Sequence, residues 1–498
     1  MQRCRLTRLA AAVLPLLSLS AHSATITVNN AGDTSAIDGF CTLREAIQSA
    51  NSNNAAGSGC VDGEGSGVMD TIIFAAAQFP SNVDTEIALT GTVLPTIEDD
   101  LTIDGSDTGG VTIDASAISD RVLSTVGSIV TLDNLTLSGG SSGMAQNGGG
   151  IAITGGEVTI RNSTIRNNSA GSPGYYGYGG GLHARDEAIV TIENSQILDN
   201  HSTGSGGGLA LNYGSVAGLQ LILRDSTVAG NSATDQGGGL YVSESASADV
   251  IRSTISNNRA QSGAGILVSL GEVSLANSTL SGNYALDSGG AITAFGDQTS
   301  LLLDSCTISN NTASDQAGGI FAYGSNVGMA GPFLEVGIRN TILAGNHVNL
   351  AMSSGIELYS GYTTFMVEYS ILGDSRYSNG QAFETLMAVT GFPPNATNIT
   401  ATSNGSAPAA IGEIINPLDD NGGSTRTHEL IETSIALDAG NDVFCNSEPT
   451  SGTDQRGLPR PSGEGCDIGA FELQEEADDE SSFFMIPLRN GRVVVIDL

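Results

Sequence analysis

Short runs in residues 146–350 place an apolar residue at every second position. One kind of run follows each glycine cluster, as at Ile151 and Ile153, and another precedes a Ser-Thr pair, as at Leu221 and Leu223. This period of two is typical of strands with one buried face. No run of helical period interrupts it. We therefore predict two or three short strands in each repeat and no helix.

The glycine clusters and a recurrent asparagine set the length of the repeat. The clusters begin 26 to 31 residues apart, at Gly148, Gly179, Gly206, Gly237, Gly263, Gly289 and Ala317. The asparagines are Asn168, Asn200, Asn231, Asn258, Asn283, Asn311 and Asn346. A propeller blade needs four strands in about 40 residues, so this repeat is too short for one. We predict an all-β fold, a single-stranded right-handed parallel β-helix, with Gly and Asn at its corners and stacked asparagines bonded to one another.

The N-terminal residues predict export and a cap. Residues 1–23 combine three arginines, an apolar stretch and a small-residue cleavage site, as a secretory signal does. Within residues 24–75, positions 41–50 predict the one amphipathic helix, started by a capping box of Thr42 and Glu45. An open solenoid end exposes apolar rungs and strand edges, which this helix would cover. In an exported chain Cys41 and Cys60 are expected to pair, worth roughly 3 kcal/mol.

The net charge and the composition limit the kinds of partner that this chain is expected to bind. The formal net charge is −35, and all 18 basic residues are arginine. Such a chain is repelled by nucleic acid and by anionic membrane surfaces, so neither is an expected partner. Aromatic residues make up only 5% and tryptophan is absent, so the core must be aliphatic. No later apolar stretch is long enough for a transmembrane helix.

The regular repeats belong to a predicted solenoid over residues 76–415, followed by three shorter segments. Residues 416–472 are expected to close the end of the solenoid, residues 473–481 form an acidic linker, and residues 482–498 contain an Asn-Gly turn between apolar runs, typical of a β-hairpin. Two interpretations of this hairpin tail remain open: a docking or envelope-attachment signal, or a strand pair packed on the solenoid.

Three stretches resemble families of exported bacterial proteins. Cys41-Thr-Leu-Arg-Glu-Ala46 with Asp70-Thr-Ile-Ile-Phe74 resembles the CSLREC domain, although Ala46 replaces its second cysteine. Gly289-Gly-Ala-Ile292 resembles the repeats of polymorphic outer membrane proteins. The segment from Asn416 to Glu472 resembles the choice-of-anchor Q domain. These resemblances imply a secreted or surface-exposed β-helix, imply no particular reaction, and imply that Cys445 and Cys466 pair.

One candidate binding surface is the outward face of the strand after each glycine cluster. Aromatic rings there could stack on sugars, and arginine could bind hydroxyls or carboxylates. A covering loop and the general preference of strands for aromatic residues would explain the same pattern without a ligand. The candidate residues are Arg185, Tyr213, Tyr241, Phe295, Phe321 and Tyr323.

Acidic residues two positions before a glycine cluster are the weaker candidates. Asp235, Asp287 and Asp315 recur there and could share Ca²⁺ through carboxylate oxygens, although the default interpretation is that they are turn residues. The closing segment carries further polar residues that invite a site, and solenoid backbone needs such groups in any case. These residues are Asp420, His428, Asp438, Arg456 and Asp467.

The sequence contains no nucleotide, zinc or nucleophile-elbow motif, and Cys306 replaces the serine of neighbouring repeats without a histidine to activate it. We therefore expect no catalytic residues and no cofactor other than Ca²⁺. The favoured function is a non-catalytic protein, secreted or on the outer surface of a bacterium, that binds a surface glycan or a protein. The alternatives are a polysaccharide lyase or glycosidase on the same fold, and a purely structural matrix component.

Overall fold

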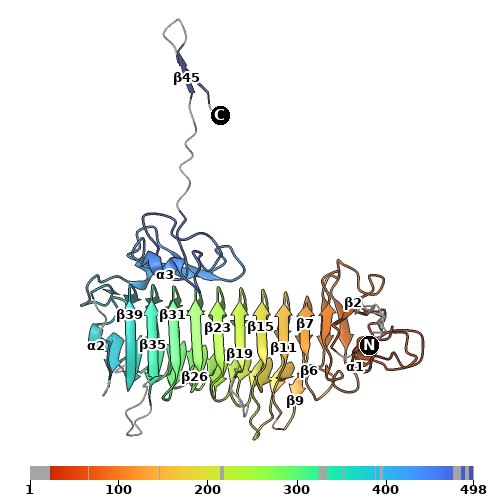
Figure 1. Cartoon of the computed structure of the whole chain (residues 1–498). Coiled ribbons are helices and arrows are strands. Elements are labelled where there is room, and N and C mark those ends of the chain that lie inside the picture. Colours follow the sequence, from red (N-terminus) through yellow and green to blue (C-terminus); the bar gives the residue numbers. More distant parts are fainter. Residues whose placement is uncertain are drawn as a thin grey trace, which may run out of the picture.

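The computed structural model describes residues 23–474 except 66, 145, 213–217, 325–333, 351–353, 387–388 and 393–395, together with the backbone of two strands, 484–487 and 493–496. The predicted signal peptide and most of the predicted acidic linker lie outside the described residues. The chain forms one long parallel β-solenoid, shown side-on in Figure 1. Four parallel sheets run along it, and each complete coil contributes one strand to every sheet in turn.

Sheets 1 and 2 each contain 12 strands. Sheet 1 consists of β1 (Thr25–Val28), β2 (Asp70–Phe74), β4 (Leu101–Asp104), β7 (Ile129–Asp133), β11 (Glu157–Arg161), β15 (Ile189–Glu193), β19 (Gln220–Arg224), β23 (Ser247–Ile251), β27 (Glu272–Ala276), β31 (Ser300–Asp304), β35 (Leu334–Arg339) and β39 (Thr363–Glu368). Sheet 2 consists of β3 (Thr85–Ala88), β5 (Val111–Asp114), β8 (Leu135–Ser138), β12 (Thr164–Arg166), β16 (Gln196–Leu198), β20 (Thr227–Ala229), β24 (Thr254–Ser256), β28 (Thr279–Ser281), β32 (Thr307–Ser309), β36 (Ile342–Leu343), β40 (Ile371–Leu372) and β42 (Ile399–Thr400).

Sheets 3 and 4 are smaller, with 8 and 10 strands. Sheet 3 consists of β9 (Ser141–Ser142), β13 (Ser169–Ala170), β17 (His201–Ser202), β21 (Ser232–Ala233), β25 (Arg259–Ala260), β29 (Tyr284–Ala285), β33 (Thr312–Ala313) and β37 (His347–Val348). Sheet 4 consists of β6 (Leu123–Val126), β10 (Ile151–Thr154), β14 (Leu182–Arg185), β18 (Leu209–Leu211), β22 (Leu240–Ser243), β26 (Ile266–Ser269), β30 (Ile292–Phe295), β34 (Ile320–Tyr323), β38 (Leu358–Gly361) and β41 (Phe383–Thr385).

The inward faces of sheets 1, 2 and 4 are mainly aliphatic, as the alternation predicts. In sheet 1, for example, Val158 pairs with Val190 and Val190 pairs with Leu221, and all three side chains are buried. Each repeat nevertheless holds four strands where the sequence predicts two or three. The additional strand is the two-residue strand of sheet 3, which is too short to show a period of two.

The recurrent asparagines form a continuous hydrogen-bonded ladder inside the solenoid, as predicted. The side-chain Nδ2 and the backbone N–H of Asn168 both donate to Oδ1 of Asn200, each at 3.0 Å. The same pair of bonds recurs at every step to Asn346, and all seven asparagines are buried. Each step therefore satisfies buried donors that water cannot reach.

Glu357 ends this asparagine ladder by taking the place of the next asparagine. Its Oε2 accepts from Nδ2 of Asn346 at 2.6 Å, and its Oε1 accepts from the backbone N–H groups of Gly345 and Asn346 at 2.9 and 3.2 Å. The side chain has no exposed surface. Burial raises the pKa of Glu357 to about 8, although the donors from Asn346 oppose that shift.

A second ladder runs along the corner between sheets 1 and 2. There the backbone N–H of Ser163 donates to Oγ of Ser195 at 3.1 Å, and Ser195 donates likewise to Ser226 at 3.0 Å. Cys306 stands in the same line, and its N–H donates to Oγ1 of Thr341 at 3.1 Å. Its thiol is free and buried, as the sequence predicts, and burial raises the pKa of Cys306 to about 12.

The N-terminal helix α1 (Leu43–Ser52) packs against β1 and β2 at one end of the solenoid (Figure 1). The predicted capping box is present: Oγ1 of Thr42 accepts from the N–H of Glu45, whose carboxylate accepts from the N–H of Thr42. The apolar face of Leu43, Ala46, Ile47 and Ala50 is buried. Cys41 forms the expected disulfide with Cys60.

The segment predicted to close the solenoid end lies instead along its side, as Figure 1 shows for α3 (Asp442–Asn446). It also contains β43 (Ile415–Asp419) and β44 (Thr427–Leu430), which pair antiparallel, and follows the 3-10 turn η1 (Ile411–Glu413). Three threonines on the outward face of sheet 2 anchor it. They are Thr254, bonded to the carbonyl of Arg426, Thr279, bonded to Gln455, and Thr307, bonded to the N–H of Ala470.

The far end of the solenoid is covered by a different part of the chain. Helix α2 (Asn379–Ala382) leads into β41, and Phe383 and Phe392 pack there against each other and against the main core. The sequence placed the closing segment at this end because its position in the chain is last, which does not determine its position in space. At the C-terminus, β45 (Phe484–Pro487) and β46 (Val493–Ile496) form the expected antiparallel hairpin.

Candidate functional site

The candidate binding residues lie on the outward face of sheet 4, in two parallel lines that the strand register defines. Tyr241 and Phe321 share one line, which continues from Phe321 to Tyr359 and Glu384. Arg185 and, several coils away, the paired residues Phe295 and Tyr323 occupy the strand position two residues further on. Tyr213 lies outside the described residues. The described candidates therefore share one sheet, but they lie in two lines and not in the single stripe that the sequence suggests.

Aromatic rings gather at the C-terminal end of this face. The rings of Phe321 and Tyr359 stack with centroids 5.3 Å apart and planes at 4°, and those of Phe321 and Tyr323 lie 6.2 Å apart at 17°. Tyr362 meets Tyr323 edge-on at 5.7 Å. We call these four residues the ring cluster. Its stacked faces are turned toward each other, so an approaching ligand would meet ring edges and hydroxyl groups.

Phe295 differs from the ring cluster because its ring remains 48% exposed beside it. It is paired in register with Tyr323 on the next coil. A ring this exposed on a strand retains a face for a ligand, and aromatic contacts of that kind contribute about 1 kcal/mol each. Phe295 is therefore the sequence-predicted residue that most clearly offers an apolar surface.

The other end of the face has a different character. Arg185 is half exposed, donates to Oγ1 of Thr154 at 3.2 Å and lies 3.5 Å from the carboxylate of Asp186. Beside it His183 is buried and shares a 2.7 Å hydrogen bond with Oδ1 of Asn212. Burial lowers the pKa of His183 to about 4, so the imidazole is neutral at pH 7. His183 is therefore a buried, neutral histidine with a hydrogen-bond partner, which is a structural role.

The acidic candidates form a row on the corner that leads into sheet 4. The backbone N–H of Asp315 donates to the carbonyl of Asp287 at 2.9 Å, and Asp287 and Gln261 continue the same bonding toward Asp235. Burial and the charge of Asp315 both raise the pKa of Asp287. Asp315 also raises the pKa of Tyr359, after burial and the charge of Glu384. The acidic row and the ring cluster are thus electrostatic neighbours.

Within the described part of the chain, no group of three or more His, Cys, Asp or Glu side chains is arranged to hold a metal ion. Asp287 and Asp315 form only a pair from adjacent coils, which stack about 4.8 Å apart. The residues present could therefore supply some of the oxygen ligands that Ca²⁺ prefers, with the remainder from water or from a ligand.

The polar residues of the closing segment bond mainly to other groups of that segment. Both ring nitrogens of His428 are engaged, with the carbonyl of Asn416 and with Oγ of Ser281. Asp438 accepts from the N–H of Gly465, and Asp467 accepts from the N–H groups of Asp438 and Leu473. Arg456 pairs with Asp454 and lies over the ring of Phe471 at 3.6 Å. Asp420 is exposed at a turn.

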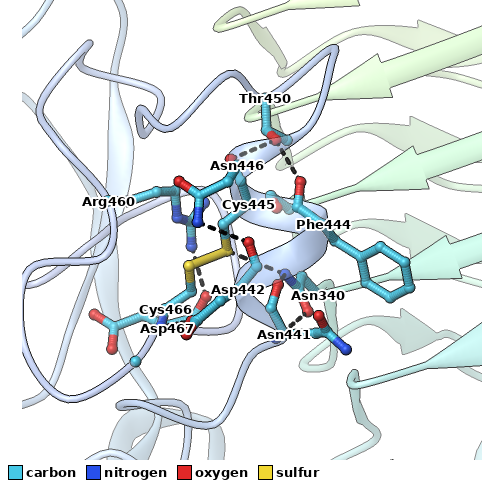
Figure 2. The surroundings of a disulfide bond; sticks show 12 residues. Asn340, Asn441, Asp442, Phe444, Cys445, Asn446, Thr450, Arg460, Cys466 and Asp467 are labelled. Carbon is cyan, nitrogen blue, oxygen red and sulfur yellow. Dashed lines mark hydrogen bonds between the residues drawn. A yellow bond between two sulfur atoms is a disulfide. The ribbon is translucent and has the colours of Figure 1, made fainter.

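A buried ion pair and a disulfide link different parts of this segment to one another. Arg460 and Glu472 form an ion pair of 3.1 Å with no exposed side-chain surface on either side. Arg460 also donates to Oδ1 of Asn277 on the solenoid. Figure 2 shows Arg460 beside the disulfide between Cys445 and Cys466, which forms as the family resemblance implies. The ion pair and the disulfide hold the segment together, and the hydrogen bond from Arg460 to Asn277 attaches it to the solenoid.

Sequence reasoning missed Tyr359, Tyr362 and Glu384. They follow a stretch in which the glycine cluster is reduced to Gly355, so the repeat spacing no longer marks the strand. The usable signal was the alternation of Leu358 and Ser360, which places Tyr359 on the outward face. None of the described helices is long and apolar enough to cross a membrane.

The fold has recognisable relatives. The model of the right-handed beta helix region matches residues 87–271 and 207–380, together more than half of the chain. Among solved structures, the crystal structure of pectate lyase Pel9A superposes with a TM-score of 0.50 over 90% of this chain and 96% of that one, at 14% identity. That identity supports likeness of fold alone. No curated protein matches the sequence. The chain belongs to the right-handed β-helix family.

Proposed function

We propose that this protein is a non-catalytic surface-interaction protein that binds an extended glycan along the outward face of sheet 4. The observation that carries the proposal is the ring cluster next to exposed Phe295, in register over successive coils. A polymer lying along the solenoid axis would meet equivalent positions every 4.8 Å or so. Carboxylates of the acidic row would accept hydrogen bonds from sugar hydroxyls.

The setting of the proposed activity is outside the cytoplasm. Two disulfides among the described residues are typical of an oxidising compartment. The signal-like residues 1–23 and the resemblances to the CSLREC and choice-of-anchor Q domains support a secreted or cell-surface protein of a bacterium. We propose that the hairpin of β45 and β46 attaches the protein to the envelope.

A polysaccharide lyase or glycosidase is the second candidate, favoured by one specific observation. Asp287 and Asp315 stand on adjacent coils, and the charge of Asp315 contributes to the raised pKa of Asp287. Glycoside hydrolysis generally uses a pair of carboxyl groups on either side of the scissile bond. The likeness to a pectate lyase concerns the fold alone and identifies no catalytic residue, because the two sequences are only 14% identical.

One experiment separates the two candidates. The purified chain is incubated with neutral and uronic acid polysaccharides, with and without Ca²⁺, and retention on the polymer and shortening of the polymer are measured together. We expect retention without shortening. Phe295→Ala should weaken retention about fivefold, the equivalent of about 1 kcal/mol. Tyr284→Ala, on the outward face of sheet 3, is the matched control and should change nothing.

Each other outcome has a defined meaning. Shortening that disappears in Asp287→Asn or Asp315→Asn would make the protein an enzyme and overturn the proposal. Retention that needs Ca²⁺ and is lost in the same two variants would show that the acidic row binds the cation. If the chain neither binds nor shortens any polymer, a structural or protein-binding role replaces the glycan.

A further inference from the structure

Sheet 1 contains a pocket that none of the sequence motifs indicates. The central outward line of this sheet begins with six threonines in register, Thr25, Thr71, Thr102, Thr131, Thr159 and Thr191. Near the other end the same line reads Leu302, Gly337 and Met366 on β31, β35 and β39. Gly337 has no side chain, and its two neighbours have long apolar ones. The result is a pocket of about 290 Å³ with Gly337 at its floor.

The two ends of this pocket carry opposite charges. Glu335 and Arg339 lie on the same strand as Gly337, two residues before and two residues after it, and both line the pocket. Their Cα atoms are four strand steps apart, which is about 13 Å. Glu335 is exposed. An apolar trough therefore joins a carboxylate at one end to a guanidinium at the other.

The side chain of Arg339 is held in place, but it lacks a strong hydrogen-bond acceptor. Its guanidinium lies 5.0 Å from the centroid of the Phe444 ring on α3, and one Nη donates to Sδ of Met366, a weak acceptor, at 3.4 Å. Figure 2 shows the Phe444 ring directed away from the disulfide, toward the solenoid strands. Nε of Arg339 is buried and has no hydrogen-bond partner among the described residues.

The acids beside Arg339 leave that donor free. Asp304 and Glu368 flank Arg339 in register, yet neither accepts a hydrogen bond from Nε of Arg339 in the described part of the chain. A buried donor without an acceptor is unfavourable, so a carboxylate ligand that reaches it gains binding energy. An oriented, half-buried guanidinium suits that role, since guanidinium groups recognise carboxylates through paired N–H groups.

We propose that this pocket binds an ω-amino carboxylate, an apolar spine with a carboxylate at one end and an ammonium at the other, as presented by a carboxyl-terminal lysine of a partner peptide. The carboxylate binds Arg339, the spine lies over Gly337 between Leu302 and Met366, and the ammonium binds Glu335. The pocket lies on a different sheet from the proposed glycan face, so the two proposals stand independently.

The probe is 6-aminohexanoate, titrated into the purified chain by calorimetry, with hexanoate and hexylamine as singly charged analogues. We expect 6-aminohexanoate to bind at least tenfold more tightly than either analogue. Glu335→Gln should weaken 6-aminohexanoate about tenfold and leave hexanoate unchanged. Glu272→Gln is the matched control, because Glu272 occupies the same outward line as Glu335 two coils earlier, outside the pocket.

A second variant tests the trough itself. Gly337→Leu should abolish binding of all three compounds by filling the pocket. The strand should tolerate it, since the nearest atom to an added Cβ is the flexible Cδ1 of Leu302 at 2.8 Å and Gly337 does not adopt a left-handed backbone. Unchanged melting of this variant verifies the fold. Equal binding of the three compounds, no binding of 6-aminohexanoate, or an affinity unaffected by Glu335→Gln overturns the proposal.

The natural source of the ligand is tested by competition. A short peptide that ends in lysine should displace 6-aminohexanoate when its terminal carboxylate is free, and should lose at least tenfold in affinity when that carboxylate is amidated. Equal displacement by both peptides overturns the assignment to a carboxyl terminus.

Discussion

Buried polar groups stabilise the coils and the closing segment in different ways. In the coils the same pair of bonds repeats at every asparagine from Asn168 to Asn346, and no single bond is unusual. In the closing segment one residue, Arg460, bonds to Glu472, Asn277 and two carbonyl groups. Repetition spreads stability over neighbouring coils, as in other solenoids. An irregular segment depends on a few residues that have no substitutes.

The largest expected effect follows from this dependence. Arg460→Met leaves the buried Glu472 side chain without its cation, with only the backbone N–H groups of Ser462 and Asp467 as donors, which should destabilise the closing segment by about 3–5 kcal/mol. Limited proteolysis should cut residues 416–472 much faster while the coils stay resistant. Arg426→Met, at an exposed arginine of the same segment, is the control and should be neutral. Uniform cleavage of both regions would show that the segment and the coils unfold together.

A smaller loss is expected inside the asparagine ladder. Asn258→Leu removes the acceptor of two donors of Asn231 and one of the two donors to Oδ1 of Asn283, which keeps only the backbone N–H of residue 258; the expected cost is about 2–3 kcal/mol. Asn258→Asp keeps the acceptor and should cost less. Urea denaturation followed by far-ultraviolet circular dichroism measures both. Equal losses in the two variants would mean that the acceptor contributes little.

The last expected effect is a dependence of stability on pH at the end of the ladder. The pKa of Glu357 is raised from 4.5 to about 8, so the folded protein retains a proton that the unfolded chain releases. Stability from this group is therefore fully present below pH 4.5 and decreases as the pH rises through 8. Melting temperatures measured between pH 5 and 8 should fall more steeply for the native chain than for Glu357→Gln. Parallel profiles would contradict this role of Glu357.

Sequence patterns predicted what repeats and missed what occurs once. The spacing of Gly and Asn was sufficient for the coil, the asparagine ladder and the buried Cys306, because every coil repeats the same local requirement. Thr42 and Glu45 likewise predicted the start of α1, since a capping box is local. Cys445 and Cys466 were paired only through a family resemblance.

The misses share a physical cause. The position of the closing segment depends on contacts such as Thr279 with Gln455, separated by 176 residues, and no local pattern encodes them. The pocket at Gly337 exists only because Leu302 and Met366 are its neighbours in register, which becomes visible after the coils are aligned. The two lines of sheet 4 were combined because outward positions two residues apart look equivalent along the sequence.

The asparagine ladder also has a direction, and this bears on how the molecule is made. Each asparagine donates to the next one toward the C-terminus, so a newly completed coil carries buried donors that only the following coil can satisfy. A ribosome delivers the coils in that same order, and each finished coil becomes the template on which the next one condenses. The ladder stops at Glu357, whose side chain accepts from Asn346 without offering a further amide. Sheets 1, 2 and 4 continue past it to β39, β42 and β41, so the last strands are added without this template.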